Sequence, residues 1–224
     1  MVKRGPKPKK IIDTTWRPNL AYAIGLLATD GCLANDNLLI DLTSKDREQL
    51  ENFSRCLGVK FNVGTKENGD GQKCLRVQFK NRIFYDFLLS IGLTPKKSLT
   101  MGQLAVPEKY FFDFLRGCFD GDGCFYSYWD PRWKSSHMFY LEFVSASKKH
   151  ITWLQREIEV KTNAHGHITN NGRNSTLQLK YAKREALAII KKMYYNPKVV
   201  SLSRKKIKIK KALKIEDKQQ KKYR

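Results

Sequence analysis

The sequence lacks three features that would place it in common functional classes. It has no run of about 18 consecutive apolar residues, which excludes an ordinary transmembrane helix. Its five cysteines never fall at CxxC spacing, and its four histidines add no zinc-finger pattern. The opening segment, MVKRGPKPKK, contains no apolar stretch of the kind found in secretory signals. We therefore expect an intracellular protein with reduced cysteines and neither a membrane segment nor structural zinc.

Acidic residues are scarce relative to basic ones. The 224 residues include 43 Lys and Arg against 21 Asp and Glu, which gives a formal net charge of +22. Self-repulsion of this size opposes a compact chain, so we expect a polyanionic partner, and nucleic acid fits best. A membrane surface is the alternative polyanion, and the missing apolar segment disfavours it. The length suits one large domain or two small ones.

An apolar helix pattern ending in Asp-Gly occurs twice, as LAYAIGLLATDG over 20–31 and as FLRGCFDGDG over 114–123. Small residues recur four apart in each run, which leaves one helical face nearly bare, so two such helices can pack closely. Asp30 and Asp122 would then lie side by side at the negative ends of two helix dipoles. That placement is unfavourable unless a cation lies between them. The pattern predicts a metal site.

The same order of elements follows each Asp-Gly: two extended runs, a Ser-Lys pair, a helix, a hairpin and a second helix. Asp30 and Asp122 lie 92 residues apart, whereas Lys45 and Lys148 lie 103 apart, so the second half carries a net insertion of about eleven residues in its first hairpin. The repeat predicts an α+β fold of two pseudo-symmetric αββαββα halves.

We expect five segments along the chain. They are a basic arm over 1–17, one half over 18–98, a linker over 99–107, a second half over 108–206, and a basic tail over 207–224. Residues 204–214 have an amphipathic pattern that could form a last helix, and we expect the end of the tail, KQQKKYR, to be disordered.

The strands combine an apolar face with long polar side chains at alternate positions. We assign to the buried face Leu39, Leu75, Val77, Phe79, Leu141, Phe143, Leu177 and Leu179. The polar array could be an ordinary solvated sheet face, but on so basic a protein we expect it to contact DNA, because a β-ribbon fits a major groove. The expected contacts are Asn35, Asn37, Asp41, Thr43, Arg76, Gln78, Lys80, Tyr126, Tyr128, Arg132, Lys134, Tyr140, Glu142, His165, His167, Arg173, Gln178 and Lys180.

The two Asp-Gly runs resemble the paired signature of the LAGLIDADG homing endonucleases, in the two-motif, single-chain form. The resemblance in element order covers about residues 18–206. It implies that the motif helices form the interface between the halves and that the antiparallel sheets form a saddle over DNA. It also implies that Asp30 and Asp122 bind divalent cations, next to the backbone carbonyl regions of Gly31 and Gly123. The implied cofactor is Mg²⁺, with Mn²⁺ or Ca²⁺ able to substitute in binding.

The resemblance further implies a polar residue and a lysine near each scissile phosphate, at the end of the second strand of each half. Those residues are Ser44 with Lys45 and Ser147 with Lys148, serine standing where the family often has glutamine. Lys97 and Lys205 are candidates for a third catalytic element. We interpret Asp120, at the other acidic position of the second motif, as a helix-end group and not a ligand.

We expect a metal-dependent, site-specific endonuclease that acts as a monomer and cuts double-stranded DNA at a long asymmetric target. We also expect that its gene lies in an intron. The alternative is an intron RNA maturase of the same fold, which binds DNA or RNA without cleavage. An intein would need a nucleophile at its first residue and a C-terminal His-Asn, and this sequence has neither, so we expect a free-standing protein. A transcription regulator would be expected to carry a helix-turn-helix appendage and to dispense with the two carboxylates.

Overall fold

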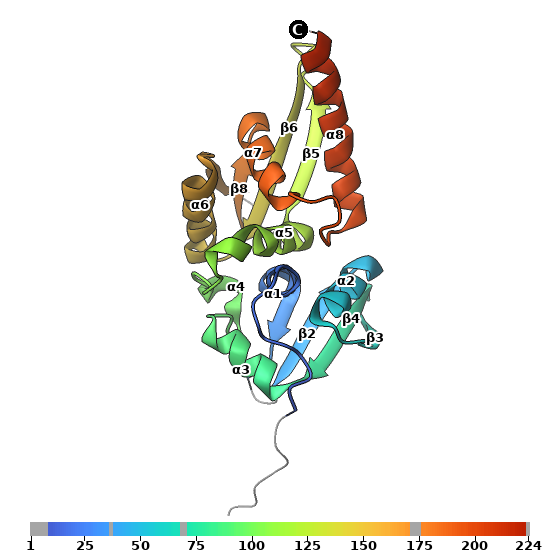
Figure 1. The fold of residues 1–224 in the computed structure, drawn as a ribbon, viewed down its shortest axis with the longest axis vertical. Coiled ribbons are helices and arrows are strands. Elements are labelled where there is room, and N and C mark those ends of the chain that lie inside the picture. Colours follow the sequence, from blue (N-terminus) through green and yellow to red (C-terminus); the bar gives the residue numbers. More distant parts are fainter. Residues whose placement is uncertain (1–8, 36–37, 68–70, 171–175, 223–224) are drawn as a thin grey trace, which may run out of the picture.

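The computed structural model describes residues 9–35, 38–67, 71–170 and 176–222, and it contains two similar halves joined end to end (Figure 1). The elements of the first half are α1 (Pro18–Asp30), β1 (Gly31–Leu33), β2 (Leu39–Ser44), α2 (Arg47–Leu57), β3 (Val63–Glu67), β4 (Lys73–Lys80) and α3 (Arg82–Ser90). Those of the second half are α5 (Phe111–Asp122), β5 (Cys124–Trp129), β6 (His137–Ser145), α6 (Lys148–Thr162), β7 (His167–Asn170), β8 (Leu177–Tyr181) and α7 (Lys183–Met193). The α+β fold predicted from the internal repeat is confirmed.

Each half contains one antiparallel four-stranded sheet, in the orders β1-β2-β4-β3 and β5-β6-β8-β7. The halves differ most in the first hairpin. Only the three residues of β1 pair with β2, whereas β5 pairs with β6 along the whole of Cys124–Trp129. The extra length of this hairpin is the insertion that the sequence comparison indicated.

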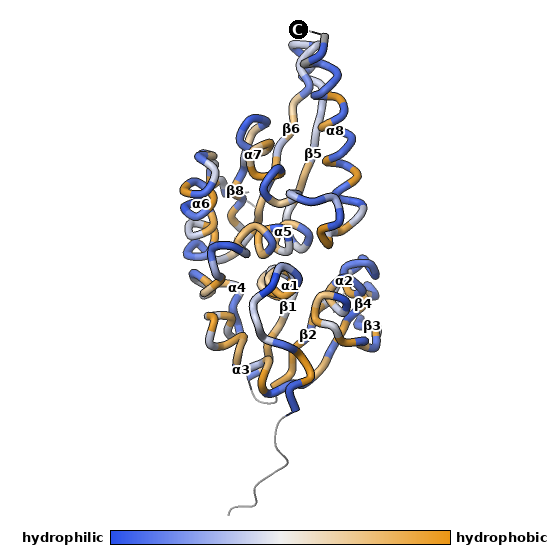
Figure 2. Tube along the Cα trace, viewed as in Figure 1, coloured by the Kyte–Doolittle hydropathy of each residue, from blue (hydrophilic) through white to orange (hydrophobic). Residues whose placement is uncertain are grey.

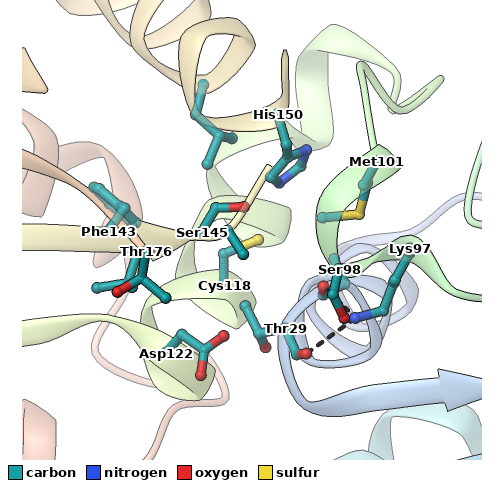
Figure 3. Close-up of a pocket in the computed structure, with 14 residues that line it drawn as sticks. Thr29, Lys97, Ser98, Met101, Cys118, Asp122, Phe143, Ser145, His150 and Thr176 are labelled. Atoms are coloured by element: carbon teal, nitrogen blue, oxygen red, sulfur yellow. Dashed lines mark hydrogen bonds between the residues drawn. The ribbon is translucent and has the colours of Figure 1, made fainter. Parts of the chain in front are cut away.

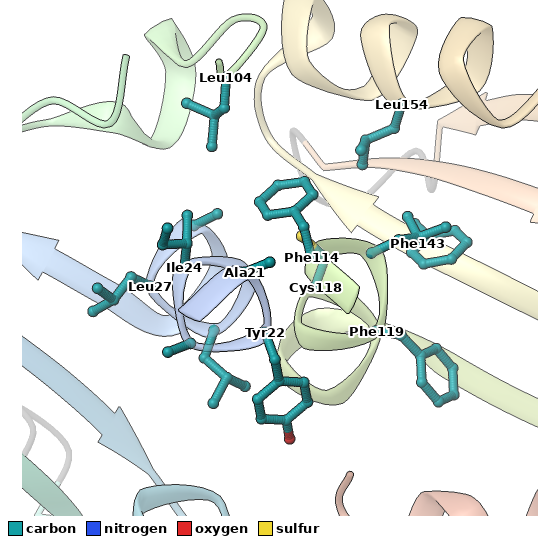
Figure 4. Close-up of a cluster of buried hydrophobic side chains, with 14 of the residues drawn as sticks. Ala21, Tyr22, Ile24, Leu27, Leu104, Phe114, Cys118, Phe119, Phe143 and Leu154 are labelled. Atoms are coloured by element: carbon teal, nitrogen blue, oxygen red, sulfur yellow. The ribbon is translucent and has the colours of Figure 1, made fainter. Parts of the chain in front are cut away.

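The two motif helices, α1 and α5, pack against each other at the centre of the molecule (Figures 1 and 4). Glycines make the close approach possible. A Cβ atom on Gly25 would lie 2.8 Å from the backbone nitrogen of Cys118 and closer still to the carbonyl oxygen of Phe114. Gly117 is equally confined by the backbone of Tyr22. Around this contact the apolar side chains of both helices form one continuous core that spans the two halves.

The strand register separates a buried face from a polar face on each sheet, because directly paired residues point to the same side. Ile40 and Leu42 are fully buried and pair with Phe79 and Val77, so this face packs on the helices. Leu39 pairs with Lys80 and therefore lies on the polar face. The assignment of Leu39 to the buried face was wrong by one position, since Ile40 and Leu42 take that role in β2.

Two further helices lie outside the repeated unit. The short α4 (Lys97–Thr100) and a 3₁₀ turn (Glu108–Tyr110) connect the halves, and α8 (Ser203–Lys222) follows the second half. The helix α8 crosses position 206 without a break and includes most of KQQKKYR, so the expected disorder of 218–222 is wrong. No helix within the described ranges is long and apolar enough to span a bilayer.

We predict that Gly25→Ala destabilises the protein by about 3 kcal/mol, because the added methyl group must push α1 away from the backbone of α5. Chemical denaturation followed by circular dichroism measures the loss. Gly64→Ala in β3 is the matched control, since nothing lies within 4 Å of its Cβ position and its cost should be well under that of Gly25→Ala. Equal costs for the two variants would contradict the close helix contact.

Candidate functional site

The last residues of the two motif helices meet at one end of the helix interface. Asp30 ends α1 and Asp122 ends α5, and each is followed by a glycine in extended backbone. A Cβ atom on Gly121 would lie 2.9 Å from Oδ2 of Asp30, so this carboxylate reaches the last turn of the opposite helix. Burial, together with the negative charge of Asp122, raises the pKa of Asp30 to about 6. Two carboxylates therefore share one small region.

The two carboxylates have different surroundings. Asp30 is half-buried, and its Oδ2 accepts a hydrogen bond of 2.5 Å from the side-chain amide of Gln49, on the first turns of α2. Asp122 is exposed and lines a cavity of about 220 Å³ (Figure 3). Partial removal from water raises the pKa of Asp122, against the opposite effect of the Lys97 and Lys205 charges. The pseudo-symmetric site is thus asymmetric in detail.

The cavity beside Asp122 lies between the ends of the motif helices and α6. Thr29, Lys97, Cys118 and His150 contribute to its wall (Figure 3). His150 is buried, and burial lowers its pKa to about 4, so the ring is neutral at physiological pH. Its Nδ1 lies 2.8 Å from the carbonyl oxygen of Gly102 in the linker. His150 and Gln49 occupy the same turn of α6 and α2, and sequence reasoning missed both.

The lysines expected as a third catalytic element cap the motif helices. The ammonium group of Lys97 donates to the carbonyl oxygens of Ala28 (2.7 Å) and Thr29 (3.0 Å) at the end of α1. That of Lys205 donates to Phe119 (2.6 Å), Gly121 (3.0 Å) and Gly123 (2.6 Å) at the end of α5.

Each lysine places a positive charge at the negative end of a helix dipole. Burial lowers the pKa of both lysines, that of Lys205 to about 8. An ammonium group has three donors, and Lys205 uses all three on backbone carbonyls, whereas Lys97 uses two. The carbonyl of Gly123, a predicted neighbour of the metal, is therefore already occupied by Lys205.

Asp120, which the sequence analysis interprets as a helix-end group, is enclosed by groups of the protein. It is fully buried, and its Oδ2 accepts hydrogen bonds from the hydroxyl of Tyr22 and the backbone N–H of Leu202, both at 2.7 Å. Burial raises its pKa to about 6. Asp120 thus joins α5 to α1 of the other half and to the segment that leads into α8.

The two Ser-Lys pairs do not occupy equivalent positions, which corrects the sequence alignment. Ser44 and Ser145 are the matching residues: each ends its strand, and each hydroxyl accepts the N–H of the residue two positions later. Ser147 is instead the buried N-cap of α6, and its hydroxyl donates to the carbonyl of Met101. The residue that matches Lys45 is therefore Ala146.

This shift removes two of the expected contacts. Ser147 is enclosed in the protein, and Lys148 begins α6, where it lines a groove with Leu99 and Trp153 that does not include Asp122. Ser44 pairs with Leu75, on the helix-covered side of its sheet. Lys45 is exposed, with its ammonium group 3.5 Å from Oε1 of Gln72.

Most of the residues expected to contact DNA lie on the polar faces of the sheets. By register these are Asp41, Thr43, Arg76, Gln78, Lys80, Tyr126, Tyr128, Tyr140, Glu142, His167, Gln178 and Lys180. Asn35 is in an exposed turn, and Arg132 and Lys134 are exposed in the loop between β5 and β6. Asn37 and Arg173 lie outside the described residues.

His165 and His167 are both expected DNA contacts, but only His167 lies in a described strand. His165 precedes β7, and its Nδ1 lies 3.0 Å from Oε1 of Glu159 on α6. Gly166 separates the two histidines and packs against the ring of Tyr181, where a Cβ atom would lie 2.6 Å from a ring carbon.

Charged and aromatic side chains on the polar faces contact one another. Arg76 lies 3.8 Å from Asp41, and Lys180 lies 3.3 Å from the largely buried Glu142. The rings of Tyr126 and Tyr140 stack at a centroid distance of 5.3 Å, and Tyr128 stacks on Tyr140 at 6.3 Å. These faces combine hydrogen-bonding groups with flat apolar surface, as groove recognition requires.

The donor set at the helix ends suits a hard divalent cation. Within the described residues no cluster of three or more His, Cys, Asp or Glu side chains could hold a metal, which leaves the pair of carboxylates. Mg²⁺ commonly binds through one or two carboxylates, with water and substrate phosphate completing its coordination. The raised pKa of Asp30, caused in part by Asp122, shows that their negative charges repel. A shared cation would relieve this repulsion.

No protein-family model matches the chain, and no curated protein matches it either. Solved structures do match. The meganuclease I-SmaMI bound to uncleavable DNA has a TM-score of 0.59 at 13% identity, over 92% of each chain. The homing endonuclease I-WcaI bound to its DNA recognition sequence has a TM-score of 0.57 at 17% identity, over 89% of this chain and 92% of that one.

Full-length DUF199/WhiA from Thermatoga maritima also matches, with a TM-score of 0.55 at 12% identity, over 92% of this chain and 69% of that one. At these identities the likeness concerns the fold. The chain has the two-half LAGLIDADG fold, with the motif helices at its centre, as the resemblance implied.

We predict that Asp30→Asn stabilises the protein at neutral pH. The folded-state pKa of about 6 lies above the ordinary value of 3.8, so the ionised carboxylate opposes folding, and protonation relieves this cost as the pH falls. The variant should therefore gain about 1–2 kcal/mol at neutral pH, and the gain should vanish as the pH falls toward 3.8.

Thermal denaturation across this pH range in EDTA measures the gain. Asp86→Asn is the control, because Asp86 forms an exposed ion pair with Arg82 on α3 and should show no such gain. An Asp30→Asn variant that is less stable than the parent at neutral pH would contradict this assignment.

Proposed function

We propose that the protein is a metal-dependent endonuclease that cuts both strands of DNA at one specific, asymmetric site, as a homing endonuclease of the LAGLIDADG family. The observation that carries the proposal is the convergence of Asp30 and Asp122 at the ends of the two motif helices. A fold by itself does not establish an activity, so the argument depends on this site.

Mg²⁺, held by Asp30 and Asp122, would lower the pKa of an attacking water and stabilise negative charge on the phosphate. The protein's own groups support this chemistry. Gln49 holds the Asp30 carboxylate in one orientation through its side-chain amide. Lys205 fixes the backbone at the end of α5 and acts as a positioning residue, because its three donors are engaged. Lys97 keeps one donor and lines the cavity next to Asp122, where it can stabilise developing charge.

The polar faces of the sheets would position the DNA. Twelve of the expected contacts share these faces, and the longer β5–β6 hairpin extends the second face beyond the first. A single chain with unequal halves can read an asymmetric sequence. The DNA-bound state of the structurally similar I-SmaMI and I-WcaI supports this use of the fold.

Nucleic-acid binding without cleavage is the alternative, including an intron RNA maturase of this fold. The structural similarity to DUF199/WhiA supports keeping this alternative. Incubation with DNA and Mg²⁺ separates the two proposals, because a nuclease cuts the DNA and a protein of the alternative class leaves it intact.

The test is incubation of the protein with a randomised DNA library and Mg²⁺, followed by sequencing of the cut ends. We predict double-strand breaks at one related set of sequences. With a recovered target, Asp30→Asn and Asp122→Asn should each lower the cleavage rate about 10³-fold or more, because each removes a carboxylate ligand. Binding measured in Ca²⁺ should change little.

Asp86→Asn, which alters an exposed carboxylate on α3, should leave cleavage unchanged. Sequence-specific binding with no cut ends in the presence of Mg²⁺ or Mn²⁺ would support the non-cleaving alternative. Full double-strand cleavage by either motif variant would overturn the assignment of the site.

A further inference from the structure

The helix α8 concentrates positive charge outside the repeated unit. Ten of its 20 residues, from Ser203 to Lys222, are Lys or Arg, against one Glu and one Asp. The first half has no matching helix after α3, where the chain passes to the short α4. The start of α8 carries Lys205, which caps α5 as Lys97 of α4 caps α1, but the lysine-rich residues beyond it have no counterpart in the first half. The composition of that part of α8 calls for a separate explanation.

One stripe of α8 holds the helix on the helix-covered side of the second sheet. Ile209 and Ala212 are buried in the core cluster that also contains Phe125 and Phe139, the inward side chains of β5 and β6. Farther along the same stripe, Glu216 forms an ion pair with Lys183 at the start of α7. Since α7 also packs on β6, α8 lies on the face opposite to Tyr126 and Tyr140 (Figure 1).

The opposite stripe of α8 carries a ladder of lysines that faces solvent. Beside the exposed Ile207, the positions farthest from Ile209, Ala212 and Glu216 at 100° per residue are occupied by five lysines. We call these residues the α8 ladder, and they are Lys210, Lys211, Lys214, Lys218 and Lys221. All five are exposed, and the hydrophilic stretches of α8 alternate with its apolar positions in Figure 2.

The α8 ladder has little counter-charge of its own, since Asp217 is the acidic residue of α8 nearest to its five lysines in sequence spacing. Among the described residues, none of its five lysines forms an ion pair, whereas Arg76 and Lys180 on the polar sheet faces have acidic partners. Lys210, Lys214 and Lys218 are spaced four apart, and like charges at this spacing destabilise a helix by a few tenths of a kcal/mol per pair. The helix keeps an arrangement that opposes its own folding unless an anion binds along it.

We propose that the α8 ladder binds the phosphates of a second segment of double-stranded DNA, while the polar sheet faces hold the first. The ladder rises about 6 Å per step and consists of lysines, which bind phosphate as point charges and read no base edges. The body of α8 and the sheet of the second half lie between the α8 ladder and the polar face of that sheet, so one duplex cannot contact both. The chain would therefore bridge two DNA segments without sequence preference at the second.

The test is a bridging assay in EDTA, which is independent of cleavage. A long biotinylated duplex is fixed to beads, protein is added below saturation, and capture of a short fluorescent duplex of unrelated sequence is measured. We expect the parent protein to capture the short duplex, with sedimentation showing one chain with two duplexes. The triple variant Lys210→Gln, Lys214→Gln, Lys218→Gln should lose capture yet still bind the beads, and the salt slope of the second binding step should fall by about 3.

The matched control removes the same charge elsewhere, by Lys149→Gln, Lys191→Gln and Lys192→Gln, three exposed lysines of α6 and α7. It should retain capture. Saturation of the parent at one duplex per chain, or equal capture by both triple variants, would overturn the proposal. Capture of an RNA duplex in place of DNA would overturn it as well. A chain that bridges duplexes but never cleaves would refute the proposed nuclease and leave this inference standing.

Discussion

The structure depends on the close approach of α1 and α5. Gly25 and Gly117 leave no room for side chains between the two backbones, and the surrounding apolar residues of both helices form one core. This contact joins the two halves and also fixes where each motif helix ends. The relation between Asp30 and Asp122 is therefore set by helix packing, which is far more rigid than a loop would be.

That arrangement places like charges where they are least favourable, at the negative ends of two helix dipoles. The chain compensates through contacts from distant segments: Lys97 at the start of α4 holds the end of α1, and Lys205 near the start of α8 holds the end of α5. The compensation is incomplete, since burial and, after it, the negative charge of Asp122 still raise the pKa of Asp30 to about 6. A site that retains uncompensated negative charge is prepared for a cation, and this is the physical basis for the proposed metal-dependent chemistry.

Sequence reasoning recovered the features that depend on local pattern or repetition. The Asp-Gly helices, the αββαββα order and the alternation of polar residues on the strands all follow from spacing along the chain. It failed where spacing misleads. Ser147 and Lys148 repeat the letters of Ser44 and Lys45, yet they lie at the start of α6. Both halves begin this helix three residues after the strand end, and in the second half the Ser-Lys pair stands two positions farther along. The contact of Gln49 with Asp30 had no local signal, since Gln49 is an ordinary residue for the first turns of a helix. The capping by Lys97 and Lys205 also depends on contacts across more than sixty residues.

The most direct test of this account is anomalous diffraction from crystals of the protein with a cleavable or library-selected duplex and Mn²⁺. The account predicts Mn²⁺ density in contact with carboxylate oxygens of both Asp30 and Asp122, next to a DNA phosphate. Strong Mn²⁺ density elsewhere on the protein, with neither of these carboxylates as a ligand, would contradict it.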